Sequence, residues 1–451
     1  MTELQALRER YRSDKADLLA QLPSSLAASR GIHARLRKLA ALTEALLCGL
    51  CQRAALPGPI ALVAVGGFGR RQLFPYSDVD VLVLVPETHI DPALREKIEA
   101  FIHSCWDVGL EIGSSVRTVS ECLEESRRDI TVQTSLLEAH LVCGNAALFA
   151  DFQQQFRAHL DVRAFCVAKT LEMHQRHHKY EDTPYALEPN CKESPGGLRD
   201  LQMILWIAQA AGLGNSWQEL AASGLATPFE VRQIERNHAI LCLIRARLHL
   251  LAGRREDRLV FDLQTAVAES FGYRSHSPDG ALLPMRASEA LMRRYYWAAK
   301  AVTQLSQILL LNIEERLNPP TRPPQRINAR FFDKGAMIEV ASDDLYQRDP
   351  HAILETFLLY QTSAALQDLS ARTLRALYSA RSVMDNAFRR DPVNRAAFMR
   401  ILQQPAGLTH ASRLMNQTSV LGRYVWPFRR IVGQMQHDLF HVYTVDQHIL
   451  M

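Results

Sequence analysis

Residues 61–85 constrain this chain most, because they encode two buried strands with a glycine turn and two acidic residues between them. The first apolar run, Ala61–Val65, ends in Gly66-Gly67. Asp78 and Asp80 lead into the second apolar run, Val81–Val85. Short apolar runs bounded by turn residues predict buried strands, so we expect both runs to lie in one sheet.

The two aspartates predict a metal site beside a phosphate site. Side chains alternate along a strand, so Asp78 and Asp80 point to the same face. Adjacent carboxylates repel each other and need a counter-charge, and hard oxygen ligands suit Mg²⁺. Gly66 and Gly67 leave backbone amides open to a phosphate. Each part alone is also typical of an ordinary turn or a solvated strand edge, but the joint pattern indicates nucleotidyl transfer.

The composition is that of a soluble globular protein. The residues are 47% hydrophobic and 22% charged. The length of 451 residues predicts roughly two to three domains. The net charge of +4 gives no argument for a nucleic-acid partner. We expect no membrane span and no secretory signal. The eight cysteines, including Cys48 and Cys51, are scattered and are expected to be reduced thiols in the cytoplasm.

Apolar periodicity and proline content divide the chain into five segments. We expect a helical segment, an α/β unit, a helical domain, a Pro-rich linker and a final mostly helical region, at 1–54, 55–150, 151–318, 319–326 and 327–451. Smaller elements expected within them are a helix over Asp91–Val108, a strand over Leu110–Val116 and a short strand pair within 327–340.

Three blocks carry a resemblance to a known family. The first is Gly66–Arg70 with Pro75–Asp80, the second is Glu188–Gln202, and the third is Asp438–His448. The first resembles the signature of the polymerase-β-type nucleotidyltransferase superfamily. Together they resemble the bifunctional uridylyltransferase/uridylyl-removing enzymes that modify the PII nitrogen-signalling protein. The resemblance covers essentially all of this chain but only about the first half of the family's usual length.

The resemblance implies an α+β fold: a polymerase-β-like nucleotidyltransferase domain followed by helical domains, predominantly helical overall. It implies a Mg²⁺-dependent transfer of UMP from UTP to a tyrosine of the PII protein, with release of pyrophosphate. The residues alone leave open another acceptor, such as another protein or an RNA end, and a degenerate nucleotide-sensing module. The presence of both Asp78 and Asp80 argues against the degenerate module.

The resemblance also assigns roles around the first block. Asp78 and Asp80 become metal ligands, and the backbone amides of Gly66 and Gly67 contact the β- and γ-phosphates. Ser77 and Arg70 are phosphate partners, although Arg70 is equally consistent with a solvated loop cation.

A third carboxylate is expected on a neighbouring strand, as a metal ligand or as the base that deprotonates the acceptor. Glu111 and Glu138 both lie in an apolar-acid-apolar context, and Glu138 is preferred. An arginine is expected two residues after this acid, whereas this chain has His140 there.

The second block predicts a nucleotide contact. Gly196-Gly197 precede a predicted helix whose N-terminus is expected to face phosphate. Lys192 and Arg199 are expected to neutralise the triphosphate, and Asn190 to read the ribose or base. The alternative is a structural turn in which Arg199 and Asp200 form an interdomain ion pair.

Two polar clusters favour a solvated surface. His174, His177 and His178 have no carboxylate or cysteine at obvious ligand spacing, so a helix face is expected rather than a metal site. The basic group Arg245, Arg247, Arg254, Arg255 and Arg258 is expected to be solvated, with a nucleotide or an acidic partner as the alternative.

The C-terminal block suggests the start of a second catalytic domain. His437-Asp438 looks like the pair of metal-dependent HD phosphohydrolases, but His448 better matches the first ligand of that domain. The true pair would then follow Met451, so the uridylyl-removing site is expected to be incomplete in this chain. The family's regulatory domains are expected to be absent as well.

Overall fold

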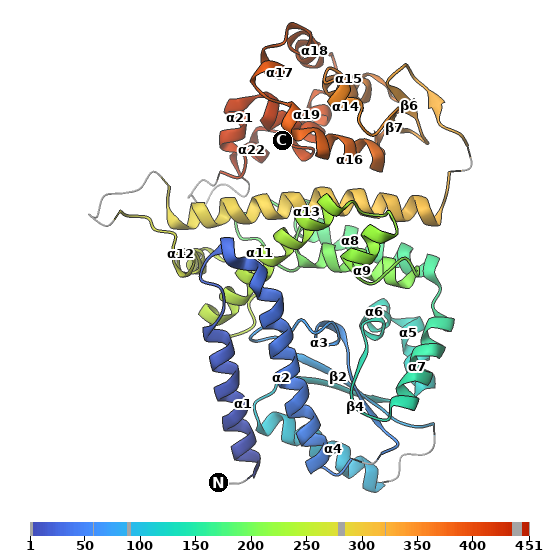
Figure 1. Cartoon of the computed structure of the whole chain (residues 1–451), viewed down its shortest axis with the longest axis vertical. Coiled ribbons are helices and arrows are strands. Elements are labelled where there is room, and N and C mark those ends of the chain that lie inside the picture. Colours follow the sequence, from blue (N-terminus) through green and yellow to red (C-terminus); the bar gives the residue numbers. More distant parts are fainter. Residues whose placement is uncertain are drawn as a thin grey trace.

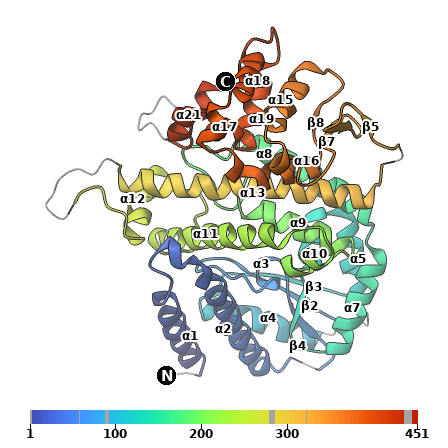
Figure 2. The same ribbon diagram turned by 45° about the horizontal axis from the view of Figure 1, so that its top comes forward.

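The computed structural model describes residues 3–56, 58–87, 92–277, 285–320, 322–434 and 444–450. Three parts are stacked along the long axis of the molecule (Figure 1). A small sheet with its helices lies at one end, long helices cross the middle, and a C-terminal unit lies at the other end. The second view shows the same order, with the long helix α13 (Ala287–Leu317) between the end parts (Figure 2). The predicted α+β class, predominantly helical, is confirmed.

The first part is built on a four-stranded sheet of order β3-β2-β1-β4. Strand β1 pairs antiparallel with β2 and β4, and β2 pairs parallel with β3. The bounds are β1 (Ala61–Ala64), β2 (Val79–Leu84), β3 (Ile112–Arg117) and β4 (His140–Gly144). The glycine turn forms the one-turn helix α3 (Gly66–Gly69) directly after β1. The two predicted strands of the first motif are therefore neighbours at the centre of the sheet.

Helices cover both faces of this sheet. Leu62 and Val83 pack on one side with the first two long helices and α4, whereas Val63 and Leu82 pack on the other side with α5 to α7. The bounds are α1 (Glu3–Ala20), α2 (Ile32–Arg53), α4 (Pro92–Asp107), α5 (Val119–Arg128), α6 (Ile130–Leu137) and α7 (Ala146–His159). The two central strands, β1 and β2, are therefore buried along nearly their whole length.

The structure corrects one expectation about this unit. Helix α4 and strand β3 agree with the predicted helix and strand to within two residues. Glu138, however, does not lie on a strand, because it caps the C-terminus of α6, two residues before β4 begins at His140. The apolar run Ser135–Leu141 combines the end of a helix with the start of a strand, and its hydrophobic pattern cannot separate the two.

The middle part is a layer of helices, as the apolar periodicity of 151–318 predicts. Helix α11 packs along α13. Helix α11 begins at a capping box of Thr227 with Glu230, and at the start of α13 the carboxylate of Glu289 accepts the backbone N–H of Arg286 at 3.3 Å. The bounds are α8 (Val162–Lys179), α9 (Leu198–Ala210), α10 (Trp217–Ala222), α11 (Pro228–Ala252) and α12 (Phe261–Ser270). The 3-10 helix η1 (Leu26–Gly31) joins the first two long helices and contacts α11.

The C-terminal unit combines short helices with a second sheet of order β5-β6-β7-β8. Its strands are β5 (Gln325–Arg326), β6 (Phe331–Asp333), β7 (Met337–Val340) and β8 (Asp368–Leu369), so the predicted strand pair is present as β6 and β7. Its helices are α14 (Leu345–Arg348), α15 (Ala352–Thr362), α16 (Ala371–Ser379), η2 (Ala380–Val383), α17 (Asn386–Arg390), α18 (Pro392–Leu402), α19 (Leu408–Gln417), α20 (Val420–Tyr424), α21 (Trp426–Ile431) and α22 (Val445–Ile449). One continuous apolar core joins this unit to the helical layer.

Three further expectations, on the cysteines, on a membrane span and on the C-terminal histidines, can be compared with the structure. All eight cysteines are free thiols. In the ranges given above, no helix combines the length and the apolar character that crossing a membrane requires. The predicted His437-Asp438 pair lies outside the described residues, whereas His448 lies in α22.

Candidate active site

A cavity of about 230 Å³ opens where the strands of the first sheet end against the helical layer. It brings together most of the residues that the sequence predicted for a nucleotide site. Those among its lining are Gly66, Gly67, Arg70, Ser77, Asp78, Asp80, Glu138, Lys192 and Arg199. Asn190 and Glu111 are not among the lining residues. The first and second sequence blocks therefore meet in space, although more than a hundred residues separate them.

The aspartate pair lies at the N-terminal end of strand β2. Asp78 directly precedes the strand and Asp80 is its second residue, so both side chains leave the same face. Burial and the adjacent charge of Asp78 raise the pKa of the Asp80 carboxyl. An ion pair with Arg255 provides a counter-charge for Asp78. Two half-buried carboxylates that repel each other are hard oxygen donors for a divalent cation, so the residues fit the predicted Mg²⁺.

The glycine turn packs closely against the aspartate pair. Gly66 has φ +57°, and a Cβ at this position would lie 3.5 Å from Oδ2 of Asp80 and 3.2 Å from Oγ of Ser135. At Gly69 a Cβ would lie only 2.4 Å from the carbonyl oxygen of Glu138. The turn therefore requires glycine at Gly66 because of its positive φ, and at Gly69 because of the close contact with the end of α6.

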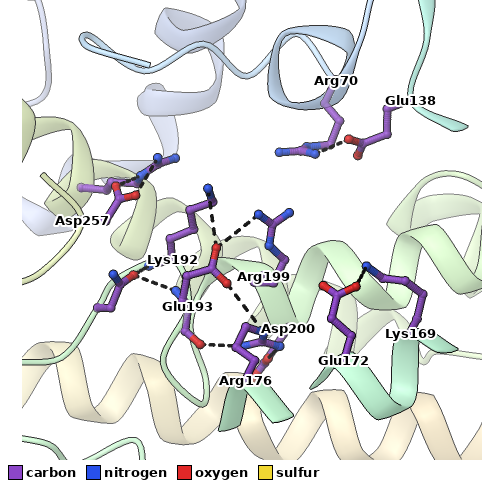
Figure 3. A network of polar contacts seen from close by, with 12 residues as sticks. Arg70, Glu138, Lys169, Glu172, Arg176, Lys192, Glu193, Arg199, Asp200 and Asp257 are labelled. Atoms are coloured by element: carbon purple, nitrogen blue, oxygen red, sulfur yellow. Dashed lines mark hydrogen bonds and ion pairs between the residues drawn. The ribbon is translucent and has the colours of Figure 1, made fainter. Parts of the chain in front are cut away.

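Glu138 holds two other residues of the cavity. One carboxylate oxygen pairs with the Arg70 guanidinium (Figure 3). The other accepts the indole N–H of Trp206. The side chain of Glu138 is 4% exposed and that of Arg70 is 20% exposed, so this is a buried ion pair. The geometry makes Glu138 a residue that orients Arg70 toward the cavity.

Trp206 forms a platform for three cations. The charged groups of Lys169, Arg199 and Arg70 lie 4.6, 5.1 and 5.7 Å from the centre of its ring. Such contacts between a cation and an aromatic face hold the cations in place without neutralising them. Lys169 is buried and also bonds Glu172 at 2.6 Å. Sequence reasoning missed Lys169 and Trp206, because nothing in the local pattern of α8 or α9 distinguishes them from ordinary helix residues.

Glu193 connects the cations of the second block. Its carboxylate lies 3.2 Å from Arg199, 3.6 Å from Lys192 and 3.7 Å from Arg176 (Figure 3). Burial raises the pKa of Glu193, but Arg199 and Lys192 outweigh burial and the net shift is downward. Burial and Arg199 lower the pKa of Lys192. This carboxylate therefore holds the two cations beside the cavity.

The alternative ion pair between Arg199 and Asp200 does not form. Asp200 is buried and accepts Nη2 of Arg176 at 2.6 Å and Nε2 of His177 at 2.9 Å, while Arg199 pairs with Glu193. His177 thus bonds a buried carboxylate instead of belonging to a fully solvated face. His178 lies 3.4 Å from Asp182 and remains exposed.

The N-terminus of α9 is not open to phosphate, contrary to prediction. The amides of Leu198 and Arg199 donate to the carbonyl oxygens of Cys191 and Lys192 at 3.0 and 2.9 Å. Gly196 has φ +75°, and a Cβ there would lie 2.2 Å from the carbonyl oxygen of Ala299 in α13. The glycine pair therefore allows close packing of the loop on α13, and the charges of Lys192 and Arg199 face the cavity instead.

The Asn190 side chain stabilises this loop by hydrogen bonds to its backbone. Its Oδ1 accepts the backbone N–H groups of Lys192 and Glu193 at 2.9 and 2.8 Å. These bonds fix the start of the turn that carries Lys192. In this structure the Asn190 side chain contacts the loop that positions a cation.

Two members of the basic group line the cavity. Arg255 pairs with Asp78, and Arg245 bonds Asp257 at 2.5 Å. The other members bond elsewhere: Arg247 to the carbonyls of Leu22 and Pro23, Arg254 to Glu256 and Arg258 to Glu188. The expectation of a solvated face is therefore wrong for Arg245, which is buried. Arg255 lines the cavity with a side chain that is 55% exposed.

Glu111 lies on another side of the aspartate pair. It lines a separate hollow with Trp106 that also contains Asp78 and Asp80. The two candidate third acids thus flank the pair in different cavities. Glu138 is occupied by Arg70 and Trp206, whereas Glu111 is exposed.

Comparison with known proteins shows which family the sequence resembles. The family model described as "GlnD PII-uridylyltransferase" matches residues 164–310, and the one described as "Uridylyltransferase GlnD third domain" matches residues 331–424. A protein of Burkholderia pseudomallei (strain 1106a) named "Bifunctional uridylyltransferase/uridylyl-removing enzyme" is 60% identical over 98% of this chain and 50% of its own length. A protein of the same name from Cupriavidus metallidurans is 59% identical over 99% of this chain and 51% of its own length.

The chain thus spans about half the length of the curated relatives it matches. The matched share of this chain includes both the sheet with its aspartate pair and the two segments that the family models recognise. The chain belongs to the family of bifunctional uridylyltransferase/uridylyl-removing enzymes.

Proposed function

We propose that this chain transfers UMP from UTP to a tyrosine hydroxyl of a PII protein in the cytoplasm, with release of pyrophosphate. One observation carries the proposal: a carboxylate pair, a glycine turn and a set of cations from distant segments line one cavity. Membership of the family supplies UTP, tyrosine and PII as the expected substrates. The free cysteines agree with a reducing compartment.

In the proposed reaction, the tyrosine oxygen attacks the α-phosphorus of UTP. The bond from that phosphorus to the oxygen bridging to the β-phosphate breaks, and pyrophosphate leaves. Asp78 and Asp80 would hold Mg²⁺, which when bound neutralises phosphate charge and favours the deprotonated hydroxyl. Charge spreads over the phosphate oxygens during transfer, so correctly placed cations supply most of the catalysis.

The chain's own cations have distinct parts in this scheme. Lys192 and Arg199 are already held beside the cavity by Glu193, so little reorganisation is needed when a triphosphate enters. Arg255 neutralises Asp78 until the metal and nucleotide arrive. Arg70 is oriented by Glu138 and Trp206 toward the phosphates. Since Glu138 is occupied in this way, Glu111 is the stronger candidate for the base that takes the tyrosine proton.

The test is transfer of labelled UMP from UTP to purified PII protein in the presence of Mg²⁺. Parallel reactions contain ATP, CTP or GTP, and a matched reaction contains the Asp80→Asn variant. We expect label on PII from UTP alone, and at least about a 10³-fold lower rate in the variant with its fold intact. Label from another nucleotide would establish a different donor, and undiminished turnover of the variant would overturn the site.

A further inference from the structure

A second cavity, of about 360 Å³, lies between the helical layer and the C-terminal unit. Its walls come from α11 and α13 on one side and from α16, η2, α20 and α21 on the other. Figures 1 and 2 show α16 and α21 on the side of α13 that faces away from the first sheet. It shares no lining residue with the candidate active site. We refer to it as the distal basic cavity.

The charge of the distal basic cavity is entirely positive. No aspartate or glutamate is among its lining residues. The cationic residues that line it are Arg236, Arg294, Lys300, Arg381, Arg423 and Arg429. Within the described ranges, none of these six forms an ion pair with a carboxylate. Four of the six, Arg294, Lys300, Arg381 and Arg423, are half-buried. Unpaired cations in such positions are unusual, since charges removed from water are normally paired.

Neutral groups hold the innermost cations in place. The Arg381 guanidinium lies 3.6 Å from the centre of the Tyr378 ring and donates to Oε1 of Gln304. Arg423 donates to the carbonyl oxygen of Arg381 at 2.7 Å, and Lys300 donates to Oδ1 of Asn416 at 3.3 Å. These contacts fix the geometry of the cations but leave their charge uncompensated.

One donor of this group has no partner at all. Nε of Arg381 is buried and makes no hydrogen bond to any described residue. A buried N–H group without an acceptor costs stability, so this donor is available to an acceptor that a ligand brings. The nearby carboxylate of Asp446 raises the pKa of Lys300 through its charge. Its oxygens, however, accept hydrogen bonds from Gly433, Thr444 and Asn416.

Mutual repulsion within the group is also evident in the pKa values. Burial and the neighbouring Arg381 lower the pKa of Arg423 to about 10, and Arg429 contributes to the same shift. Burial lowers the pKa of Lys300 to about 8, with Arg381 and Arg423 acting in the same direction and Asp446 opposing them. A bound polyanion would relieve this repulsion.

The rim of the cavity has a different character. Trp297 is 44% exposed there, and the Arg293 guanidinium lies 5.1 Å from the centre of its ring. Arg236 and Arg429 are exposed at the same rim. A rigid aromatic face beside several guanidinium groups suits a planar base with attached phosphates.

We propose that the distal basic cavity is a second anion site, which takes a small ligand with two or more phosphate groups, such as a nucleoside diphosphate. Arginine forks bind phosphate oxygens in pairs, and several of them around one cavity match more than one phosphate. The cavity joins the two segments that the family models match, 164–310 and 331–424. A ligand here would therefore bridge the helical layer and the C-terminal unit.

The test is calorimetric titration of the full chain with inorganic pyrophosphate and with ADP. The titrations use the Lys192→Gln/Arg199→Gln variant, in which phosphate binding at the candidate active site is weakened, so that binding at the distal basic cavity can be measured separately. We expect this variant to retain one binding site per chain for each probe. Adding Arg236→Gln/Arg429→Gln, which changes only exposed rim residues, should weaken that remaining binding at least about tenfold.

The matched control is Arg316→Gln, because Arg316 lies on α13 outside the cavity and donates to the carbonyl oxygen of Ser223 at 3.1 Å. It should leave binding unchanged. Thermal unfolding of each variant verifies that the chain is folded. The proposal is wrong if Lys192→Gln/Arg199→Gln alone removes all binding, or if the rim variant binds as tightly as its parent. Neither result depends on UMP transfer, so the proposed activity is tested separately.

Discussion

At the scale of single residues, Glu138 and Glu111 have separable roles. Glu138→Gln breaks the buried ion pair with Arg70, and we expect a loss of about 3–5 kcal/mol in stability together with slower UMP transfer. Glu111→Gln changes an exposed side chain, and we expect unchanged stability with a lower kcat and an unchanged KM. Denaturant unfolding and steady-state kinetics of both variants test this assignment. Unaltered stability in Glu138→Gln would contradict the positioning role.

A buried histidine, His238, beside a half-buried one, His33, predicts acid sensitivity. The rings of His33 and His238 lie 4.6 Å apart. Burial lowers the pKa of His33 to about 4, with Arg37 acting in the same direction, and burial with His33 lowers the pKa of His238 to about 3. The unfolded chain protonates these groups near pH 6.5, so it binds more protons than the folded chain from that pH down to about 3.

Stability should therefore be full above pH 6.5 and fall as the pH drops from 6.5 toward 3, because folding then excludes protons that the unfolded state binds. The measurement is the unfolding temperature from pH 7.5 to pH 4 for the wild-type chain and for His238→Gln. We expect a flatter profile in the variant. Equal slopes would mean that other groups cause the acid sensitivity.

At the scale of elements, the loop before α9 depends on one glycine. Gly196→Ala places a Cβ 2.2 Å from the carbonyl oxygen of Ala299, in addition to the strain of φ +75°. Gly212→Ala is the matched control, because its φ is +69° but nothing lies within 4 Å of the added Cβ.

We expect Gly212→Ala to cost about 1–2 kcal/mol and Gly196→Ala to cost clearly more, with slower UMP transfer as Lys192 and Arg199 shift. Denaturant unfolding gives the first comparison and the transfer assay gives the second. Equal costs at the two glycines would show that the contact with α13 is unimportant.

The elements also show what local sequence can and cannot predict. The hydrophobic pattern predicts the two strands, and residue type identifies the glycine turn and the aspartate pair. The structure has all three where they were predicted. Lys169 and Trp206 enter the cavity from α8 and α9, and only tertiary packing brings them there. The α9 N-terminus was wrongly predicted to be open, because preceding carbonyl oxygens in the chain accept its amides.

At the scale of the whole molecule, one buried ion pair connects the helical layer to the C-terminal unit. Nε of Arg375 on α16 lies 2.7 Å from Oε1 of Glu230, and its Nη2 donates to the carbonyl oxygen of Leu225 at 2.8 Å. Glu230 is 1% exposed and also completes the capping box of α11. Removing Arg375 would leave a buried carboxylate without its charged partner.

Because one apolar core spans both parts, we expect the wild-type chain to unfold the helical layer and the C-terminal unit together. Arg375→Met should cost about 3–5 kcal/mol, lower the unfolding temperature and make residues 322–434 susceptible to limited proteolysis before the rest. Arg372→Met is the control, since Arg372 lies on the same helix but pairs at 2.5 Å with Asp343, whose side chain is 83% exposed, and such a pair contributes about 1 kcal/mol or less. If both variants unfold and are cleaved alike, the Arg375–Glu230 ion pair does not couple the two parts, and the shared core with the other polar contacts across the boundary holds them together.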